Sequence, residues 1–324
     1  MNAFRWAGLA GAVTATLVLV SACGAIAPEP PTPTSRPGLG ATPGAPSPTP
    51  QAPVTSDAPA GRAVSRLPAP DAAVPADPAR AARALDRTTL ALRAAIDAWT
   101  AGGGVDAWPP PRPVVLLALY QQRIYRELAQ DPAFAARVVS HLPPGLAQEA
   151  RTNVAAGTRL FSLVHRPTHR TPVALRTRPP LPAGVLLRYY REAERRFHVS
   201  WEVLAAVNYI ESKFGRVVSS SSAGAQGPMQ FIPSTWAAYG LGGDVHDPHD
   251  AILGAANYLH ASGAPGDDAK ALYAYNHAIP YVSAVLLYAR RMASDPRAFF
   301  EYYNWQVFVL TPTGDRRLTG PGLG

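Results

Sequence analysis

Trp201-Glu-Val-Leu-Ala-Ala-Val-Asn-Tyr-Ile-Glu211-Ser-Lys213 is the stretch of sequence that decides the fold. Ser200 in front of it is a typical N-cap residue, and Glu202 falls in the first turn, where a negative charge is favoured. The apolar residues of the stretch are Val203, Leu204, Val207 and Ile210. Their 3–4 spacing predicts a helix with one buried side. Glu211 lies on or beside that side, whereas Glu202 is expected to face solvent.

The position of Glu211 has a chemical consequence. A carboxyl group beside an apolar face is partly desolvated, which raises its pKa. The C-terminal end of a helix carries partial negative charge and acts in the same direction. A glutamic acid that stays protonated near neutral pH is what a glycosidase needs as general acid. Taken alone the signal is weak, because a glutamate that ends a helix is more often solvated or salt-bridged.

Three ordered motifs strengthen this interpretation. They are Tyr209-Ile-Glu211-Ser-Lys-Phe-Gly215, then Ala223-Gly-Ala-Gln-Gly-Pro-Met229-Gln230-Phe-Ile-Pro-Ser-Thr235, then Ala274-Tyr275-Asn276. In this order and spacing they resemble the soluble lytic transglycosylase (SLT) family of the lysozyme-like superfamily, which includes goose-type lysozyme and is similar to glycoside hydrolase family 23. The resemblance covers roughly residues 183–292. It implies an all-α, lysozyme-like domain that cuts the glycan strands of peptidoglycan.

The resemblance also implies roles for single residues. Glu211 is the expected catalytic acid/base. Ser221, Met229 and Gln230 are the expected sugar contacts, and Tyr275 and Asn276 are expected to line the site opposite Glu211. The sequence departs from the family pattern at 228, where a proline replaces the usual leucine, and the continuation through 231–236 is closer to a neighbouring transglycosylase family. The subfamily therefore stays open.

A glycosidase ordinarily needs a second carboxylate. Within the predicted domain 182–300, the aspartates after Glu211 are Asp244, Asp247, Asp250, Asp267, Asp268 and Asp295. All except Asp244 are interpreted as helix-start residues. The lack of a clear second catalytic carboxylate suits a lytic transglycosylase, which forms 1,6-anhydromuramic acid ends without water. Should Asp244 hold a water opposite Glu211, the protein is instead a hydrolytic muramidase. The alternative of another class is a non-catalytic, peptidoglycan-binding surface lipoprotein.

Other side chains suggest weaker hypotheses. Several aromatic residues are candidates for stacking on sugar faces, although most are expected in the core: Tyr209, Trp236, Tyr239, Tyr258, Tyr273 and Tyr281. His246 and His249 lack a third ligand at a sensible spacing, so no metal site is predicted. No cofactor is predicted either.

The N-terminal region indicates export. Arg5 precedes an apolar run over 6–20, and Val20-Ser-Ala-Cys23 resembles a lipobox, so residues 1–22 are predicted to be a signal peptide and Cys23 a lipidation site. Two acyl chains would hold the protein on the outer face of the cell membrane. The alternative is an ordinary signal peptide with an incidental cysteine. Cys23 is the only cysteine, so an intrachain disulfide is excluded.

Residues 23–79 are predicted to be a disordered, Pro-rich tether that reaches into the cell wall or periplasm. Between 24 and 78 there is no aromatic residue. This leader and the Ala/Arg-rich composition resemble actinobacterial exported proteins.

The middle of the chain is predicted to be a basic helical module with a connector, over residues 80–181. Apolar periodicity and proline positions predict helices over 80–99, 113–130, 132–141 and 145–164. The segment 80–181 carries 14 Lys and Arg against 6 Asp and Glu, which equals the net charge of +8 of the whole chain. A solvated basic face and attraction to anionic wall polymers are both open interpretations. Nucleic acid is excluded as a partner by the export signal.

The remaining chain is divided into a lysozyme-like domain over 182–300 and a C-terminal strand and tail over 301–324. Further helices are predicted over 184–197, 247–260, 269–278 and 281–292. The alternating segment 305–310 predicts a strand, and a Thr-Gly-Asp turn follows it. A single strand needs a pairing partner, which the sequence does not identify.

Overall fold

The structure is a computed structural model that describes residues 67–164 and 175–323, all of them within one compact unit. The described residues form eleven α-helices, one short 3₁₀ helix and one two-stranded hairpin, so the predicted all-α class is confirmed. The predicted signal peptide, Cys23 and the tether up to residue 66 lie outside the described residues. Among the described helices, none combines the length and the hydropathy that crossing a bilayer requires.

The N-terminal helices begin and end close to the predicted positions. They are α1 (Pro78–Ala101), the 3₁₀ helix η1 (Gly104–Asp106), α2 (Arg112–Gln130), α3 (Pro132–Ser140) and α4 (Pro144–Ser162). Asp77 and Asp131 cap α1 and α3 through their side chains, and a proline stands in the first turn of each of the four α-helices. The folded part starts before residue 79, because Leu67 and Val74 already pack against the core. The tether was therefore predicted about twelve residues too long.

The second half contains seven α-helices. They are α5 (Ala183–Phe197), α6 (Trp201–Ser212), α7 (Pro233–Tyr239), α8 (Pro248–Ala261), α9 (Asp268–Tyr275), α10 (Ile279–Ser294) and α11 (Arg297–Asn304). Helix α9 ends three residues before the predicted end, because Asn276 takes an extended conformation. Helices α7 and α11 were not predicted. Each spans only seven or eight residues, which is too short for a clear apolar period.

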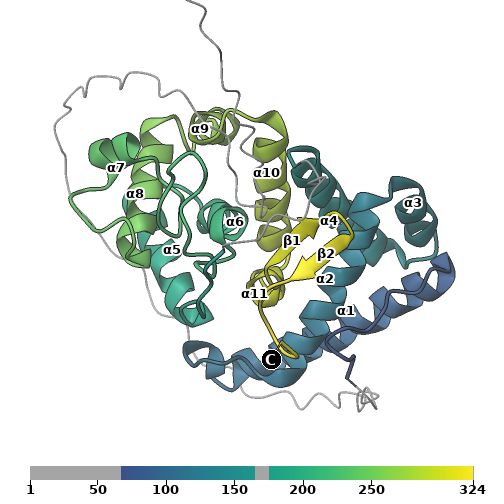
Figure 1. The fold of residues 1–324 in the computed structure, drawn as a ribbon. Helices are drawn as coiled ribbons and strands as arrows, with labels where there is room; N and C mark the ends of the chain where they lie inside the picture. The colour runs from purple at the N-terminus through teal and green to yellow at the C-terminus, as the bar shows by residue number, and fades with distance from the viewer. Residues whose placement is uncertain (1–66, 165–174, 324) are drawn as a thin grey trace, which may run out of the picture. The chain divides into compact units, whose positions relative to one another are not determined.

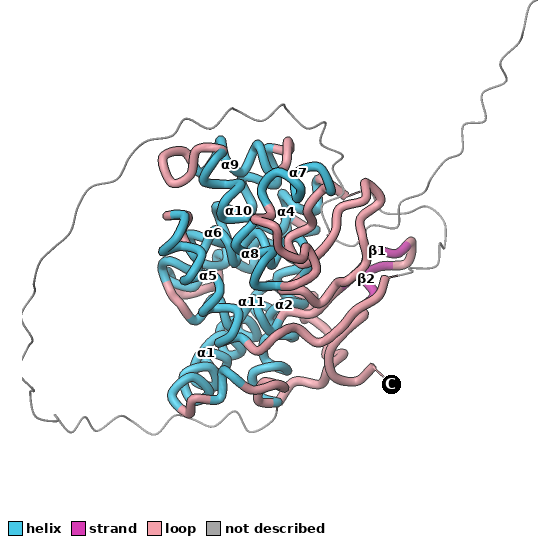
Figure 2. The backbone as a smooth tube through the Cα atoms, turned by 90° about the vertical axis from the view of Figure 1, so that its left-hand side faces the viewer, coloured by secondary structure: helices cyan, strands magenta, loops and turns pink. Residues whose placement is uncertain are grey.

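A hairpin supplies the missing partner of the C-terminal strand. Strand β1 (Phe308–Thr311) pairs antiparallel with β2 (Gly314–Arg317), and Phe308 stands opposite Arg317. The strand begins three residues later than predicted, although Val307 directly before it still bonds the opposite segment: its carbonyl accepts the Leu318 amide at 2.8 Å. Figure 2 shows the hairpin beside the loops at one side of the helices.

Helices from the two halves of the sequence share one core. Figure 1 shows α1–α4 on one side, α5–α9 on the other, and α10 and α11 between them. Helix α10 packs against both α4 and α6. Polar contacts cross the same boundary: Arg291 donates to Glu149 at 2.7 Å, and the Tyr302 hydroxyl donates to Asn153 at 2.6 Å. The boundary near residue 181 therefore divides the sequence but does not separate two cores.

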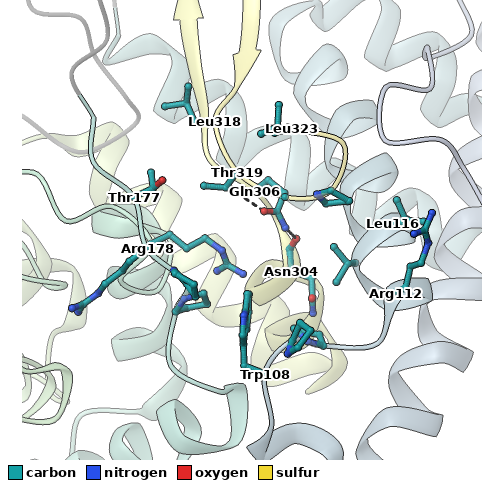
Figure 3. A pocket seen from close by; sticks show the side chains of 18 residues that line it. Trp108, Arg112, Leu116, Thr177, Arg178, Asn304, Gln306, Leu318, Thr319 and Leu323 are labelled. Atoms are coloured by element: carbon teal, nitrogen blue, oxygen red, sulfur yellow. Dashed lines mark hydrogen bonds between the residues drawn. The ribbon is translucent and has the colours of Figure 1, made fainter.

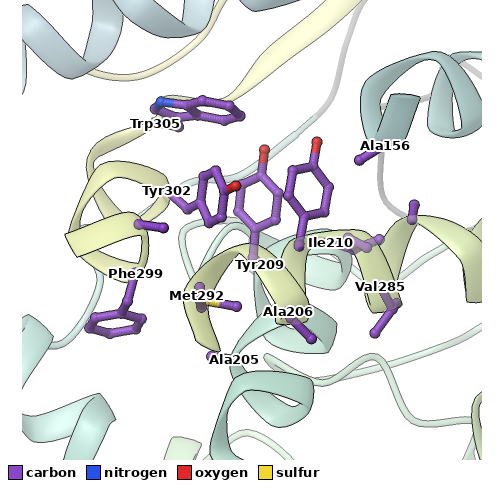
Figure 4. Close-up of a cluster of buried hydrophobic side chains, with 14 of the residues drawn as sticks. Ala156, Ala205, Ala206, Tyr209, Ile210, Val285, Met292, Phe299, Tyr302 and Trp305 are labelled. Atoms are coloured by element: carbon purple, nitrogen blue, oxygen red, sulfur yellow. The ribbon is translucent and has the colours of Figure 1, made fainter. Parts of the chain in front are cut away.

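An aromatic cluster fills the centre of this core. Tyr209 of α6 stacks on Tyr302 of α11, with ring centroids 5.5 Å apart, and Trp305 lies 4.9 Å from Tyr302 in an edge contact. Figure 4 shows Tyr209 and Tyr302 side by side next to Trp305. Such ring pairs add stabilisation beyond the area that they bury. These ring contacts hold α6 in place in the core, and with it Glu211, two positions after Tyr209.

Candidate active site

Glu211 lies in the last turn of α6 and is only 2% exposed. Ser200 caps the start of this helix as predicted, because its hydroxyl accepts a hydrogen bond from the Val203 amide. The Tyr281 hydroxyl donates to Glu211 Oε1 at 2.7 Å. Tyr281 comes from the first turn of α10, so the packing of α10 on α6 fixes the direction of the carboxyl group.

The surroundings of Glu211 favour its protonated form. Burial raises its pKa from 4.5 to about 8, against the opposing effects of the Tyr281 hydrogen bond and the charge of Lys213. Glu202, the other carboxyl group of the helix, is partly buried rather than fully solvent-facing as expected, and burial raises its pKa too. The two ends of one helix thus hold two glutamates in different environments, and only Glu211 is almost fully enclosed.

The chain turns sharply directly after Glu211. Lys213, Phe214 and Gly215 all have positive φ angles, of 55°, 59° and 79°. This conformation is costly for the first two residues, which carry a Cβ. The surrounding structure holds it: Phe214 is 1% exposed and packs on Tyr209, and the Ser212 hydroxyl accepts the Gly215 amide at 2.9 Å.

Lys213 is a buried cation beside the site. Its Nζ lies 3.9 Å from the centre of the Tyr209 ring and donates to the Tyr209 carbonyl at 3.1 Å. Burial and then the charge of Arg126 lower the pKa of Lys213 to about 7, while Glu211 raises it. Within the described part of the chain, Lys213 is the charged group that acts on the pKa of Glu211, and no second carboxylate there does so.

Two polar side chains of α6 hold the segment 226–231 against the helix. The Ser212 hydroxyl donates to the Pro228 carbonyl at 2.6 Å, and Asn208 Nδ2 donates to the same carbonyl at 2.8 Å. The Asn208 Oδ1 atom in turn accepts the Tyr190 hydroxyl at 2.6 Å. This buried network ties the second sequence motif to the first.

The segment itself is a tight loop closed by the Gln226 and Phe231 backbones. Gly227 has a φ of 72°, and a Cβ there would lie 1.8 Å from the Val245 carbonyl oxygen. Gln230 also has a positive φ, of 52°, and its Nε2 donates to the Gly227 carbonyl. Its Oε1 atom is buried and has no hydrogen-bond partner among the described residues. A buried amide oxygen in that state needs a donor.

The third motif meets the second through Tyr275. The Tyr275 hydroxyl donates to the Met229 carbonyl at 2.6 Å, and burial and then the charge of Glu211 raise the pKa of Tyr275. Asn276 ends α9 and is 6% exposed. Met229 is 0% exposed, so its side chain lies in the core, and its role as a sugar contact stays a prediction. The structure thus brings Glu211, Gln230 and Tyr275 to one place.

Ser221 lies in the loop 218–225. Its hydroxyl accepts the amides of Ala223 and Ala225, at 3.2 and 3.0 Å, and its own amide donates to the Ala225 carbonyl. These bonds are all local, so Ser221 shapes a partly exposed loop.

Asp244, for which the sequence predicted no structural role, has a structural role in the fold. Asp244 is exposed, its Oδ1 accepts the His246 amide at 2.9 Å, and its own amide donates to Asp250 Oδ2 at 2.9 Å. It therefore shapes the turn in front of α8. Asp247 and Asp267 are side-chain N-caps, as the sequence predicts.

One group of described residues has spacing suited to a metal ion. The donor atoms of Asp247, His249 and Asp250 lie within 4.8 Å of one another. These atoms already have protein partners: Asp247 Oδ1 accepts the amides of His249 and Asp250, and His249 Nε2 lies 3.1 Å from Glu192. The group serves the start of α8.

The aromatic candidates divide by burial. Tyr209 is 4% exposed and Tyr281 is 0% exposed, so neither ring offers a face to a sugar. Tyr273, at 42%, is exposed, and Trp236, Tyr239 and Tyr258 are partly buried. Tyr281 contacts Glu211 instead, a role that sequence reasoning missed. Asn208, a polar residue within an apolar helix, was a signal for a buried network.

Comparison with known protein families gives a match to part of the chain. A family model described as Transglycosylase SLT domain matches residues 188–291, about a third of the chain. No curated protein and no solved structure gives a significant match. The match supports the resemblance to the lysozyme-like SLT family for this part of the chain. It indicates an enzyme of the lytic transglycosylase type that acts on peptidoglycan glycan strands.

Proposed function

We propose that the protein is a lytic transglycosylase with Glu211 as its catalytic acid and base. It cuts the β-1,4 bond between N-acetylmuramic acid and N-acetylglucosamine and leaves 1,6-anhydromuramic acid ends. The observation that carries the proposal is the burial of Glu211, which raises its pKa to about 8. A carboxyl group in this state is protonated at neutral pH and is ready to act as general acid.

The first step is protonation of the leaving group. Glu211 gives its proton to the glycosidic oxygen, and the bond from that oxygen to C1 of the muramic acid breaks. The Tyr281 hydroxyl, bound to Oε1, steadies the carboxylate that this step leaves behind. The substrate's own N-acetyl group, or groups of the groove, stabilise the positive charge at C1.

The second step closes the ring without water. The Glu211 carboxylate takes the proton from the C6 hydroxyl of the same sugar, and that oxygen bonds to C1. Glu211 is then protonated again for the next cycle. Asp244 is exposed and its Oδ1 already accepts the His246 amide, which favours this route over a water-activating base and hydrolysis.

Gln230 is the strongest candidate for binding the glycan. Its unpartnered Oε1 suits a hydroxyl or amide donor of an amino sugar. Tyr275 holds the Gln230 loop through the Met229 carbonyl. We assign Asn276 to the same groove, opposite Glu211, and Ser221 to its edge, on the strength of the sequence motifs.

Export and anchoring complete the proposal. Lipidation of Cys23 and a Pro-rich tether would place the enzyme on the outer face of the membrane, within reach of the wall. The +8 charge of residues 80–181 would favour anionic wall polymers near the enzyme. The purpose would be remodelling of the cell wall.

Digestion of purified peptidoglycan tests the chemistry. The full chain, Glu211→Gln and Glu202→Gln are each incubated with the polymer, and the released ends are identified by mass spectrometry. Glu202→Gln is the matched control, because it makes the same change at the other end of α6. We expect anhydromuramic ends from the wild type and from Glu202→Gln, and none above background from Glu211→Gln.

Other outcomes have defined meanings. Reducing ends from the wild type would replace the transglycosylase with a muramidase. Activity retained in Glu211→Gln would remove Glu211 from the mechanism. No ends from any form would favour a wall-binding surface protein.

A further inference from the structure

A cavity lies outside the candidate active site. Its volume is about 610 Å³, within the range of small-molecule sites. Three segments line it: residues 108–116, the connector 177–180, and the C-terminal part of the chain from 304 to 323, with Arg216 from the turn after α6. In Figure 3, Trp108 and Asn304 lie at the centre of the lining, between Thr177 and Arg178 on one side and Arg112 and Leu116 on the other. None of the predicted glycan-site residues lines it.

The charge of the lining has one sign. Among the described residues that line it, Arg112, Arg178 and Arg216 are the ionisable ones, and none of these residues carries a carboxylate side chain. Arg216 is 2% exposed, yet within the described part of the chain its guanidinium has no ion pair and makes one hydrogen bond, from Nη1 to the Lys213 carbonyl at 3.2 Å. A buried guanidinium normally has an acidic partner. Because of burial, the pKa of Arg216 falls to about 10.

Aromatic rings take the place of an acidic partner. The Arg216 guanidinium lies 5.9 Å from the centre of the Trp108 ring and 5.1 Å from that of Tyr303. Trp108 is 43% exposed, which is unusual for so large an apolar side chain. The cavity thus has an aromatic face that is open to a ligand.

Asn304 also has a buried polar atom that needs a hydrogen-bond partner. It is 1% exposed, and its Nδ2 donates to the Phe300 carbonyl at 2.8 Å. Its Oδ1 atom is buried with no hydrogen-bond partner in the part of the chain that the structure describes. The neighbouring Gln306 is fully used, through Gln122, Thr319 and the Asn304 carbonyl. Within the described residues, the lining therefore contains a buried acceptor without a donor, Asn304 Oδ1, and a buried cation without an acidic partner, Arg216.

We propose that this cavity binds the end of a short peptide that carries a free C-terminal carboxylate. The carboxylate meets Arg216 and the exposed Arg178, and a peptide N–H donates to Asn304 Oδ1. Apolar side-chain atoms of the ligand lie against Trp108 and the prolines of the lining. Arginine suits this partner because its planar donors bind both oxygens of a carboxylate.

The stem peptides of peptidoglycan are the source that we assign, and this assignment rests on the proposed function. The connector that lines the cavity is bound to the segment after the active-site helix by backbone hydrogen bonds: Arg178 N donates to the Arg216 carbonyl at 2.9 Å, and Val218 N donates to the Arg176 carbonyl at 3.0 Å. The turn after Glu211 thus connects the two sites. A stem peptide held here would keep the wall polymer on the enzyme between cuts.

Calorimetric titration of the full chain with defined peptides tests the inference. The probes are acetyl-Lys-D-Ala, which has a single carboxylate, its C-terminal amide, and acetyl-Lys-L-Ala. Each is titrated into the wild type, Trp108→Ala, Arg178→Gln and Arg216→Met. Arg151→Gln, an exposed arginine of α4 outside the lining, is the matched control.

We expect the amide to bind at least about tenfold more weakly than the free acid, because it loses a charged hydrogen bond. Trp108→Ala and Arg216→Met are expected to weaken binding about tenfold, and Arg178→Gln a few-fold, while Arg151→Gln leaves it unchanged. Trp108 and Arg178 are exposed, so their variants decide the matter even where Arg216→Met does not fold. Equal binding of acid and amide, or no effect of these two substitutions, overturns the site.

The two peptide configurations identify the source. Preference for D-Ala supports the wall peptide, whereas equal binding or preference for L-Ala overturns that source in favour of peptide C-termini in general. Binding is measured without glycan cleavage, so the two proposals fail separately. A chain that binds the peptide but releases no glycan ends refutes the proposed function alone. A chain that releases ends but binds no peptide refutes this inference alone.

Discussion

Glu211 combines burial, a single hydroxyl donor and a nearby cation. Burial is the largest effect on its pKa, and the hydrogen bond from Tyr281 and the charge of Lys213 oppose it only in part. The enzyme that we propose needs one carboxyl group in both protonation states within each cycle. A pKa of about 8 provides the acid at neutral pH.

The first prediction concerns the pH dependence of glycan cutting. Activity is expected to fall as the pH rises through about 8, because the general acid is then ionised. Tyr281→Phe removes a hydrogen bond that favours the ionised form, so the pKa of Glu211 rises and this limb of the profile moves to higher pH. Rates measured from pH 5 to 10 check both expectations.

Tyr302→Phe is the control for that experiment, since it removes a buried hydroxyl that donates to Asn153 instead. Its profile is expected to keep the wild-type limb. A Tyr281→Phe profile that coincides with the wild type would show that this hydroxyl does not act on Glu211.

The second prediction concerns stability. The folded state raises the pKa of Glu211 from 4.5 to about 8, so the favourable contribution present below pH 4.5 is lost as the pH rises through this window. Glu211→Gln does not titrate. The free energy of unfolding of Glu211→Gln minus that of the wild type is therefore expected to increase from pH 5 to 8, by ~1.4 kcal/mol for each pKa unit covered.

Urea unfolding at four pH values measures this difference. Glu202→Gln, at a partly exposed carboxyl group, is expected to show a smaller change. A constant difference between Glu211→Gln and the wild type would mean that Glu211 is not desolvated in the folded protein.

Among the helices, α6 carries most of the site. Its last turn ends in a strained left-handed turn, and its polar side chains hold the loop 226–231. Ser212 contributes at both places, because its hydroxyl accepts from Gly215 and donates to Pro228. The helix therefore sets the distance between Glu211 and the Gln230 loop.

The third prediction follows from that double contact. Ser212→Ala leaves the Gly215 amide and the Pro228 carbonyl with fewer buried partners and is expected to lower the free energy of unfolding by ~1–3 kcal/mol. Glycan cutting is expected to fall as well, since the Gln230 loop loses an anchor. Ser140→Ala, at an exposed helix end, is expected to change stability by less than about 0.5 kcal/mol. Equal effects of the two substitutions would contradict the anchoring role.

Across the whole molecule, the N-terminal helices support the domain that carries the site. Helix α10 packs against α4 and also against α6. Tyr281, at the start of α10, donates a hydrogen bond to Glu211 of α6. Glu149 and Asn153 of α4 bind Arg291 and Tyr302. Removing the N-terminal helices would expose to water the apolar face of α10 and polar groups that are now buried.

The fourth prediction is that residues 182–324 alone do not unfold cooperatively, whereas residues 67–324 do. Exposure of the α10 face and loss of the Glu149 and Asn153 contacts are the physical reason. Thermal unfolding followed by circular dichroism compares the two chains. A shorter chain with the midpoint of the longer one would show that the N-terminal helices are only an addition.

The sequence by itself determined the local features. The N-caps Ser200, Asp131 and Asp247, and the apolar spacing in α6, are set by residues three or four positions apart, so they are readable without a structure. The same spacing predicted the burial of Glu211. The alternation over 305–310 predicted the C-terminal strand but not its partner, because a four-residue strand such as β2 has too few positions for a pattern.

The tertiary structure decided what joins distant residues. Tyr281 and Glu211 are 70 positions apart, and Arg291 and Glu149 are 142 apart, so no local pattern contains either contact. The burial of Met229, the role of Asp244 and the Trp108 cavity depend in the same way on how the helices pack. Local sequence fixes which side of a helix is apolar, whereas the partner of that side is chosen by the packing of the whole chain.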